Sequence, residues 1–174
     1  FRSAPPKRKS AAASRRAVSS WQDHLIWLVP VGVLLVFGTA CGFGFLDYDD
    51  RLHLIDNPLR VKSYFGMLAA AFSGPVAGLY MPVTYAYWGT LWRLTGGSPF
   101  AFHAVNLVLH AVNALLVARL LRQWGMDRRA SLVGALLFAL HPMQVESVAW
   151  VSGAKDVLSG FFALGALNLL APWT

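Results

Sequence analysis

The chain has 174 residues, of which 56% are hydrophobic and 13% charged, with a formal net charge of +7 and a pI of about 10.1. This apolar share exceeds the roughly 45–50% that is usual for soluble domains. A basic balance suits either nucleic acid or an anionic membrane surface, but six of the fifteen basic residues lie in the first sixteen positions and the others are scattered among apolar blocks. A nucleic-acid-binding domain would spread basic and aromatic side chains over a folded surface, so the pattern argues against nucleic acid and favours the lipid bilayer as a partner.

The first segment, residues 1–24, is a basic tail whose first acid is Asp23. The chain begins at Phe1 rather than Met and ends within or just past an apolar run, so we expect it to be a segment of a longer protein. Its one cysteine, Cys41, permits no disulfide within the chain.

A first transmembrane helix is predicted at residues 25–46, a stretch of 22 residues without charge. At about 1.5 Å of rise per residue it spans roughly 33 Å, enough for the hydrocarbon core of a bilayer. The apolar region of a cleaved signal peptide is normally about 7–15 residues long, so this stretch is too long for one.

The next segment, residues 47–99, is predicted to be an external loop that opens with three aspartates, Asp47, Asp49 and Asp50. Carboxylates just outside a span can bind a cation, or one can act as a general base on a hydroxyl near the lipid surface. Simple solvation of the surface is the competing explanation. Within the loop, residues 61–72 predict a helix lying in the membrane interface, and the aromatic residues of 80–92 are typical of the membrane–water boundary.

Three further spans are predicted, which gives an all-α integral membrane protein, a polytopic helix bundle of about four spans. They are residues 100–121, 130–141 and 157–174, separated by a loop at 122–129 and a turn at 142–156. Basic residues are in excess in the N-terminal tail and again in the loop at 119–129, so both are expected in the cytoplasm. The loop at 47–99 and the turn at 142–156 then lie together on the external, periplasmic or luminal, face.

Four polar residues of the second span share one helix face, since their spacings are three, four and three: His103, Asn106, His110 and Asn113. A polar stripe in a membrane helix faces the bundle interior or a cavity. It can hold the bundle together through interhelical hydrogen bonds, or it can bind substrate. One metal ion cannot use both histidines, because residues seven apart are roughly 10 Å apart along the helix axis.

The external turn carries His141, Glu146, Lys155 and Asp156. Pro142 ends the third span at its outer end. Charged groups are costly in the bilayer centre, so these residues predict a wet pocket or the interface, facing the aspartates. Ordinary loop charges are the alternative.

Three stretches of the sequence resemble one family: YDDRLHLIDNP at 48–58, PVTYAYWGTLWRLTGGSPFAFHAVNLVLHAVNALL at 82–116 and LLFALHPMQVESVAWVSGAKDVLS at 136–159. They are similar to membrane glycosyltransferases of the GT-C fold, specifically the transmembrane and tetratricopeptide-repeat (TMTC-type) protein O-mannosyltransferases and their bacterial relatives. The resemblance covers about residues 45–170, and the ordered set of motifs is more specific than any one of them.

The resemblance implies the N-terminal part of an enzyme that transfers a sugar, such as mannose, from a polyprenyl-phosphate donor to a hydroxyl of a protein or glycan acceptor, with inversion. Asp49 looks like the catalytic aspartate and Asp50 like its partner, and no cofactor is implied, while a need for a divalent metal is left open. The family often has arginine where this chain has Met81 and Ala154, and Lys155, Arg51 or Arg93 could compensate. The candidate substrate-binding residues are Glu146, Lys155, Asp156, His141, His103, Arg51 and Arg93.

Two other functions remain open at this point. One is a membrane scaffold that keeps the fold without catalysis. The other is a small transporter or channel that uses the polar stripe and does not need the outer aspartates.

Overall fold

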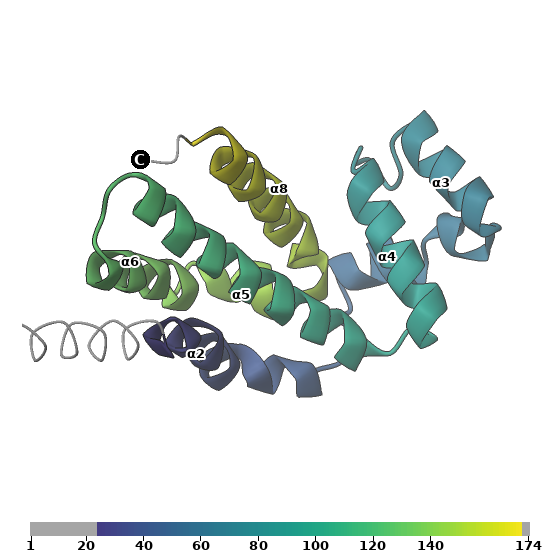
Figure 1. The fold of residues 1–174 in the computed structure, drawn as a ribbon. Coiled ribbons are helices and arrows are strands. Elements are labelled where there is room, and N and C mark those ends of the chain that lie inside the picture. The colour runs from purple at the N-terminus through teal and green to yellow at the C-terminus, as the bar shows by residue number, and fades with distance from the viewer. Residues whose placement is uncertain (1–23, 172–174) are drawn as a thin grey trace, which may run out of the picture.

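The computed structural model describes residues 24–171, which form helices joined by short turns (Figure 1). The helices are α2 (Leu28–Phe37), α3 (Tyr64–Ser73), α4 (Pro82–Thr95), α5 (Pro99–Gln123), α6 (Arg128–Leu140), α7 (Gln144–Ala149) and α8 (Ala154–Leu170). Shorter helical turns lie at Leu25–Trp27, Gly38–Gly42, Arg51–Ile55, Pro58–Val61 and Val151–Gly153. In this part of the chain the only β-pairing is an isolated bridge between Val76 and Leu79, so the all-α prediction is confirmed for the described residues.

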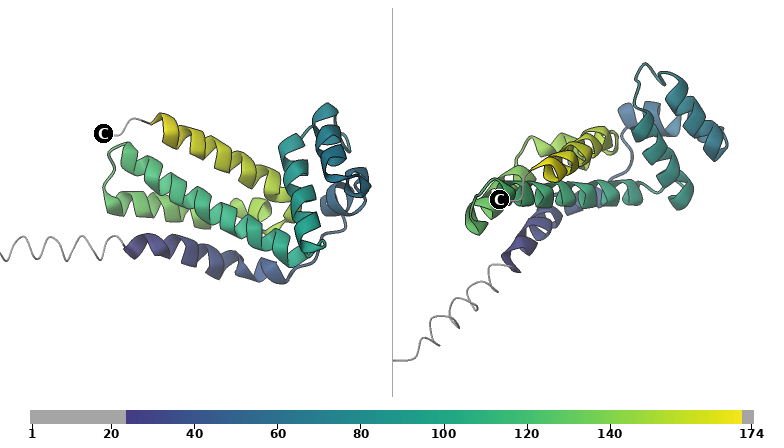
Figure 2. Two further views of the ribbon diagram at one scale, coloured as in Figure 1. Left: turned by 45° about the vertical axis from the view of Figure 1, so that its right-hand side comes forward. Right: turned by 45° about the horizontal axis from the view of Figure 1, so that its top comes forward.

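The longest helix, α5, is the centre of a bundle in which α2, α6 and α8 pack against it (Figures 1 and 2). Small residues at the contacts let the helix backbones approach closely. The buried core of the bundle consists of Val29, Val33, Phe37, Leu107, Ala114, Ala118, Ala135, Ala139, Val148 and Val157.

A second group of helices, α3 and α4, lies at one end of the bundle (Figure 2). The two helices pack where Gly89 meets Met67, since a Cβ at Gly89 would collide with the methionine sulfur. Tyr85 and Trp88 of α4 are each only 3% exposed. These two aromatic rings are therefore packed inside the protein, where the sequence had indicated a membrane–water boundary.

Local sequence accounts for where several helices begin and end. Pro82 and Pro99 stand in the first turns of α4 and α5, where a missing N–H costs nothing. The Asp127 side chain caps α6 by accepting the Ala130 N–H at 2.8 Å. Gly96 follows α4 with a φ of +67°, a left-handed conformation that glycine adopts without strain.

Two helices are long and apolar enough to cross a membrane by length and composition. The first runs from Leu25 to Gly42 with a mean hydropathy of 2.2, and the second is α5, with 25 residues and a mean hydropathy of 1.8. The first ends four residues before the predicted boundary at 46, because the backbone becomes extended at Phe43. The second matches the predicted span to within two residues at either end.

The predicted third and fourth spans are shorter helices. Helix α6 has 13 residues and α8 has 17, which at about 1.5 Å per residue gives roughly 20 and 26 Å, less than the roughly 30 Å of a bilayer core. Pro142 follows closely on the end of α6, and Lys155 and Asp156 occupy the first turn of α8. The helix predicted at 61–72 is found as α3, which begins at Tyr64 after a cap by Ser63.

Many large apolar side chains point away from the bundle, and a soluble domain rarely exposes so many together. Leu35 of α2, for example, is 79% exposed. With the two long apolar helices, this surface indicates a membrane location. Other exposed apolar residues of the bundle are Val31, Leu34, Val36, Val133, Leu137, Phe162, Leu169 and Leu170.

Candidate functional site

One buried carboxylate, that of Asp50, joins the acid cluster to the turn before α8. Asp50 is fully buried, and its two oxygens accept backbone N–H groups, from Leu46 at 2.9 Å and from Ser152 at 2.8 Å. Hydrogen bonds to a charged oxygen are the strong ones, and a buried carboxylate needs them. Asp50 therefore ties the segment after the first span to the turn before α8, 102 positions further along the chain.

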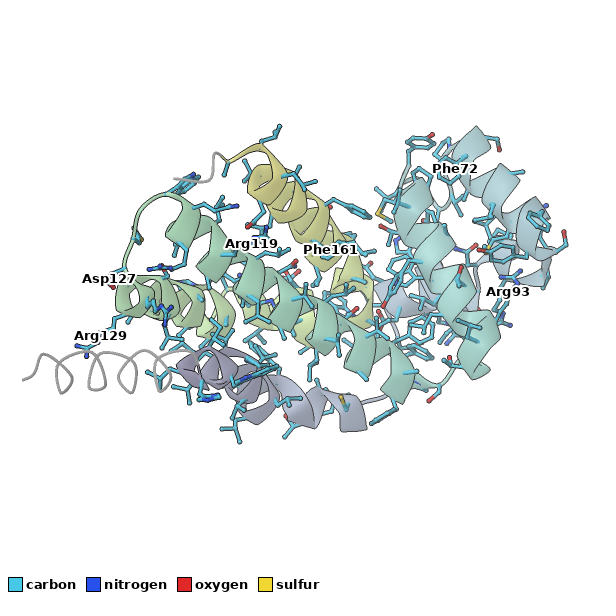
Figure 3. The ribbon with its side chains drawn as sticks, viewed as in Figure 1. Phe72, Arg93, Arg119, Asp127, Arg129 and Phe161 are labelled. Atoms are coloured by element: carbon cyan, nitrogen blue, oxygen red, sulfur yellow. The ribbon has the colours of Figure 1, made fainter. Side chains whose placement is uncertain are left out.

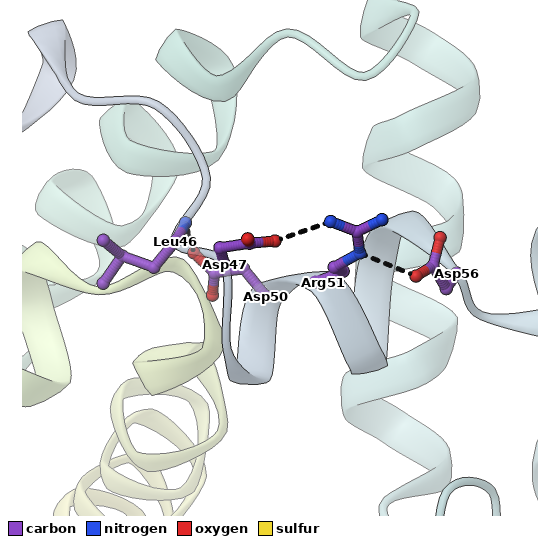
Figure 4. A network of polar contacts seen from close by, with 5 residues as sticks. All are labelled: Leu46, Asp47, Asp50, Arg51 and Asp56. Carbon is purple, nitrogen blue, oxygen red and sulfur yellow. Dashed lines mark hydrogen bonds and ion pairs between the residues drawn. The ribbon is translucent and has the colours of Figure 1, made fainter.

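The neighbouring charges form a separate surface network (Figure 4). Arg51 donates to Asp47 at 2.8 Å and to Asp56 at 3.0 Å. These bonds raise the pKa of Arg51 above its ordinary value, and the three side chains are exposed. Arg51 is thus paired with Asp47 and Asp56. It lies on the surface, at the start of the π-helical turn Arg51–Ile55.

Asp49 differs from the other aspartates of the cluster. It is half-buried, and among the residues that the structure describes its carboxylate makes no hydrogen bond or ion pair. A carboxylate without such partners can accept a proton from an incoming hydroxyl. The adjacent acids are therefore distinguished by their surroundings: Asp50 is bound to the fold and Asp49 is available.

The joint, meaning the hydrogen bonds of Asp50 to Leu46 and Ser152, is supported by contacts around Trp150. The Trp150 ring stacks on Tyr48 with centroids 6.4 Å apart, and its backbone oxygen accepts the Asn106 side-chain amide of α5 at 3.2 Å. Tyr87 of α4 in turn donates to Asn106 at 3.4 Å. The segment of Tyr48, helix α5 and helix α4 thereby hold the turn at Trp150 in place.

Lys155 lines a cavity of about 330 Å³ between the start of α4 and the start of α8. Its ammonium group donates to the Ser152 backbone oxygen at 3.4 Å and lies 3.7 Å from Asp156. Met81 lines the same cavity. Met81 stands where the resembling family often has an arginine, so that position and Lys155 line one cavity.

His53 and Tyr85 form a buried polar pair that sequence reasoning missed. The Tyr85 hydroxyl donates to the Val76 carbonyl at 2.9 Å, so at its 2.9 Å contact with His53 the Nδ1 atom must be the donor. Burial lowers the pKa of His53, the charge of Lys155 lowers it further, and Asp49 and Asp50 oppose this. Burial raises the pKa of Tyr85 to about 12, so both groups are neutral at pH 7.

The polar stripe on α5 is used largely for packing. Asn106 donates to Trp150, Asn113 donates to the Val157 oxygen at 2.9 Å, and His110 Nε2 donates to the Ala139 oxygen at 2.9 Å. The prediction of interhelical hydrogen bonds is confirmed for these three residues. His103, the fourth, is buried with its ring edge-on to Phe43.

The remaining candidates lie farther from the joint. His141 is exposed and its Nδ1 accepts the Met143 N–H at 3.2 Å, while the Glu146 side chain is exposed on α7. Arg93 belongs to the α3–α4 contact (Figure 3), where it donates to the Lys62 oxygen at 2.6 Å and lies over the Tyr64 ring. The structure does not bring Arg93 to the cavity of Lys155.

Within residues 24–171, no three His, Cys, Asp or Glu side chains lie together in a way that could hold a metal ion. The geometry thus offers a half-buried carboxylate at Asp49, a cation beside a cavity at Lys155, and a buried carboxylate at Asp50 that joins the two segments.

Fold and site together define a helical, apolar chain with an acid cluster beside one end of its bundle. The chain is 36% identical over 87 residues to a mouse (Mus musculus) protein named protein O-mannosyl-transferase TMTC3, and 45% identical over 67 residues to human (Homo sapiens) protein O-mannosyl-transferase TMTC1. A Caenorhabditis elegans protein O-mannosyl-transferase, F38B6.6, is 26% identical over 156 residues, or 82% of this chain. No family model and no solved structure matches.

These similarities cover only parts of the relatives. The mouse and human matches take in 50% and 38% of this chain but 9% and 8% of the relatives, and the C. elegans match takes in 22% of its relative. The chain is thus a distant, partial homologue of proteins named as O-mannosyltransferases, which supports the family that the sequence motifs indicated.

Proposed function

We propose that the chain is the N-terminal part of a GT-C-type membrane glycosyltransferase. It transfers a sugar, mannose by preference, from a polyprenyl-phosphate donor to a hydroxyl of a protein or glycan. The observation that carries this proposal is the pair of hydrogen bonds that Asp50 accepts, because they join the acid cluster to the turn that leads into Lys155. The names of the distant relatives support the reaction class.

In the proposed reaction, Asp49 accepts the proton of the acceptor hydroxyl as that oxygen attacks the anomeric carbon. The bond between the anomeric carbon and the phosphate oxygen breaks, and the polyprenyl phosphate leaves with the electron pair. Lys155 stabilises the negative charge that develops on the phosphate. One displacement inverts the anomeric centre.

The surroundings of the two aspartates support this division of roles. A general base needs a lone pair that is not already engaged, and Asp49 has no partner among the described residues while Asp50 accepts two N–H groups. Asp50, the neighbour of Asp49, accepts the N–H of Ser152, which stands three residues before Lys155, so the proposed base and the proposed cation belong to the same end of the bundle.

The membrane topology is part of the same proposal. The N-terminal tail and the loop after α5 are cytoplasmic, α6 and α8 complete a set of four spans, and α3 lies in the interface. The acid cluster, Lys155 and the donor phosphate then meet at the external surface, where a polyprenyl chain remains in the lipid.

The test uses full-length protein in membranes and radiolabelled polyprenyl-phosphate mannose. Asp49→Asn should abolish transfer, while Asp47→Asn, which removes a neighbouring exposed acid paired with Arg51, should retain it. Transfer that survives Asp49→Asn would exclude this residue as the base. Transfer lost equally in both variants would mean that only the total charge of the cluster matters.

A non-catalytic scaffold of the same fold is the second candidate, and the cavity favours it in one respect. Lys155 is the only cation among the described residues that line it, and Met81 stands where the resembling family often has an arginine. A scaffold predicts no transfer from any lipid-linked sugar by the wild-type protein. A panel of lipid-linked sugars therefore separates a scaffold from an enzyme with a different donor.

A further inference from the structure

A second cavity lies at the opposite end of the bundle from the acid cluster. It has a volume of about 390 Å³ and is lined by Leu25, Ile26, Leu115, Ala118, Arg119, Arg122, Arg128, Arg129, Ser131 and Leu132. Arg119 lies sixteen residues beyond His103 on α5, roughly 24 Å along the helix axis. Figure 3 shows Arg119 and Arg129 at this end and Arg93 at the other.

The lining of this cavity has two chemical halves. Four arginines come from the end of α5 and the start of α6, and five apolar residues come from the start of the first span, α5 and α6. None of the described residues that line it is acidic. The nearby Asp127 is engaged as the cap of α6, accepting the Ala130 N–H at 2.8 Å.

Arginine guanidinium groups match the geometry of phosphate oxygens, and basic pockets between membrane helices on the cytoplasmic side suit anionic lipid headgroups. A free phosphate makes no favourable contact with the apolar half of the lining, whereas the acyl chains of a phospholipid cover it. The volume lies within the roughly 300–1,000 Å³ of small-molecule sites, so it accommodates a headgroup and the first part of its chains.

We propose that this cavity binds one anionic phospholipid, with its phosphate among Arg122, Arg129 and their neighbours and its chains against the apolar residues. This site is separate from the proposed site of glycosyl transfer, and the proposed topology puts it on the other membrane face. A bound anionic lipid would hold the ends of the first span, α5 and α6 together, since all three contribute to the lining.

The test measures binding of fluorescent phosphatidylglycerol and phosphatidylcholine to the full-length protein in neutral detergent. Phosphatidylglycerol should bind more tightly and be displaced by unlabelled phosphatidylglycerol but not by inorganic phosphate. A basic side chain near a membrane surface contributes about a fivefold change in affinity. Arg129→Gln should therefore weaken binding about fivefold, and Arg122→Gln/Arg129→Gln about 25-fold.

Lys62→Gln is the matched control, because it removes one positive charge at the other end of the molecule and should leave binding unchanged. Equal affinity for the two lipids, equal loss in the Lys62 variant, or displacement by inorganic phosphate would each overturn the proposal. Circular dichroism of each variant shows whether it folds, and the comparison of the two lipids on the wild-type protein tests the proposal without any variant.

Discussion

Changing each of the two adjacent aspartates to asparagine should have different effects. Asp50→Asn should lower stability, whereas Asp49→Asn should abolish transfer and leave stability almost unchanged. Asp50→Asn keeps one acceptor oxygen but turns an amide N–H₂ toward a backbone N–H, from Leu46 or Ser152. A hydrogen bond to a charged group contributes about 1.5–3 kcal/mol, so the loss of one should lower the free energy of unfolding by about that amount. Asp49→Asn, at a half-buried carboxylate without a partner among the described residues, should change it by about 0.5 kcal/mol or less.

The assay is thermal unfolding of full-length protein in detergent, followed by circular dichroism. The Tm shift scales with the free energy that is lost, so Asp50→Asn should unfold clearly below wild type, with a shift at least about threefold larger than that of Asp49→Asn. Equal melting temperatures for wild type and Asp50→Asn would refute the reasoning, because the buried bonds would then contribute nothing.

Other predictions follow from the same contacts. Gly153→Ala should unfold the turn and abolish transfer, because a Cβ there would lie 2.7 Å from the Glu146 oxygen; normal Tm and transfer would contradict this. Asn113→Ala should cost about 0.5–1.5 kcal/mol, since the hydrogen bond from its amide to the Val157 oxygen is lost, as denaturant unfolding would reveal. Burial lowers the pKa of His53 in the folded state, so the unfolded chain binds more protons as the pH falls below about 6.5 and stability should decline there. His53→Asn should flatten that decline in Tm measured against pH, and an unchanged slope would exclude His53 as its source.

The helices could be predicted from the sequence because their apolar runs are long and their ends are marked. The charge-free stretch before Asp47 and the segment after Pro99 predict the two long apolar helices. Pro142 predicts the end of α6. The sequence predicts a loop at α4 because its aromatic residues favour the membrane–water boundary as readily as a packed helix. Tertiary contacts with His53 and Val76 distinguish the two for Tyr85 and Trp88.

The candidate site was predictable in part. The motif pointed to Asp49 and Asp50 together, but nothing in the sequence says which of two adjacent carboxylates is buried. The partner of Asp50 is the backbone N–H of Ser152, and a backbone donor leaves no residue signature. His53 was missed for a similar reason, since a histidine within an apolar run carries no mark of its tyrosine partner.

The contact between Asp50 and Ser152 also restricts how the chain is threaded through the bilayer. Two residues that touch lie on one side of the membrane, so the number of crossings between them must be even. In the proposed topology α5 supplies one crossing and the neighbouring helix α6 supplies the return, though α6 is only about 20 Å long. A return this short requires the bilayer to thin locally, or its outer end to stop below the lipid surface. In the proposed topology the acid cluster then lies over a thinner part of the membrane, which shortens the distance to the phosphate of the proposed lipid donor.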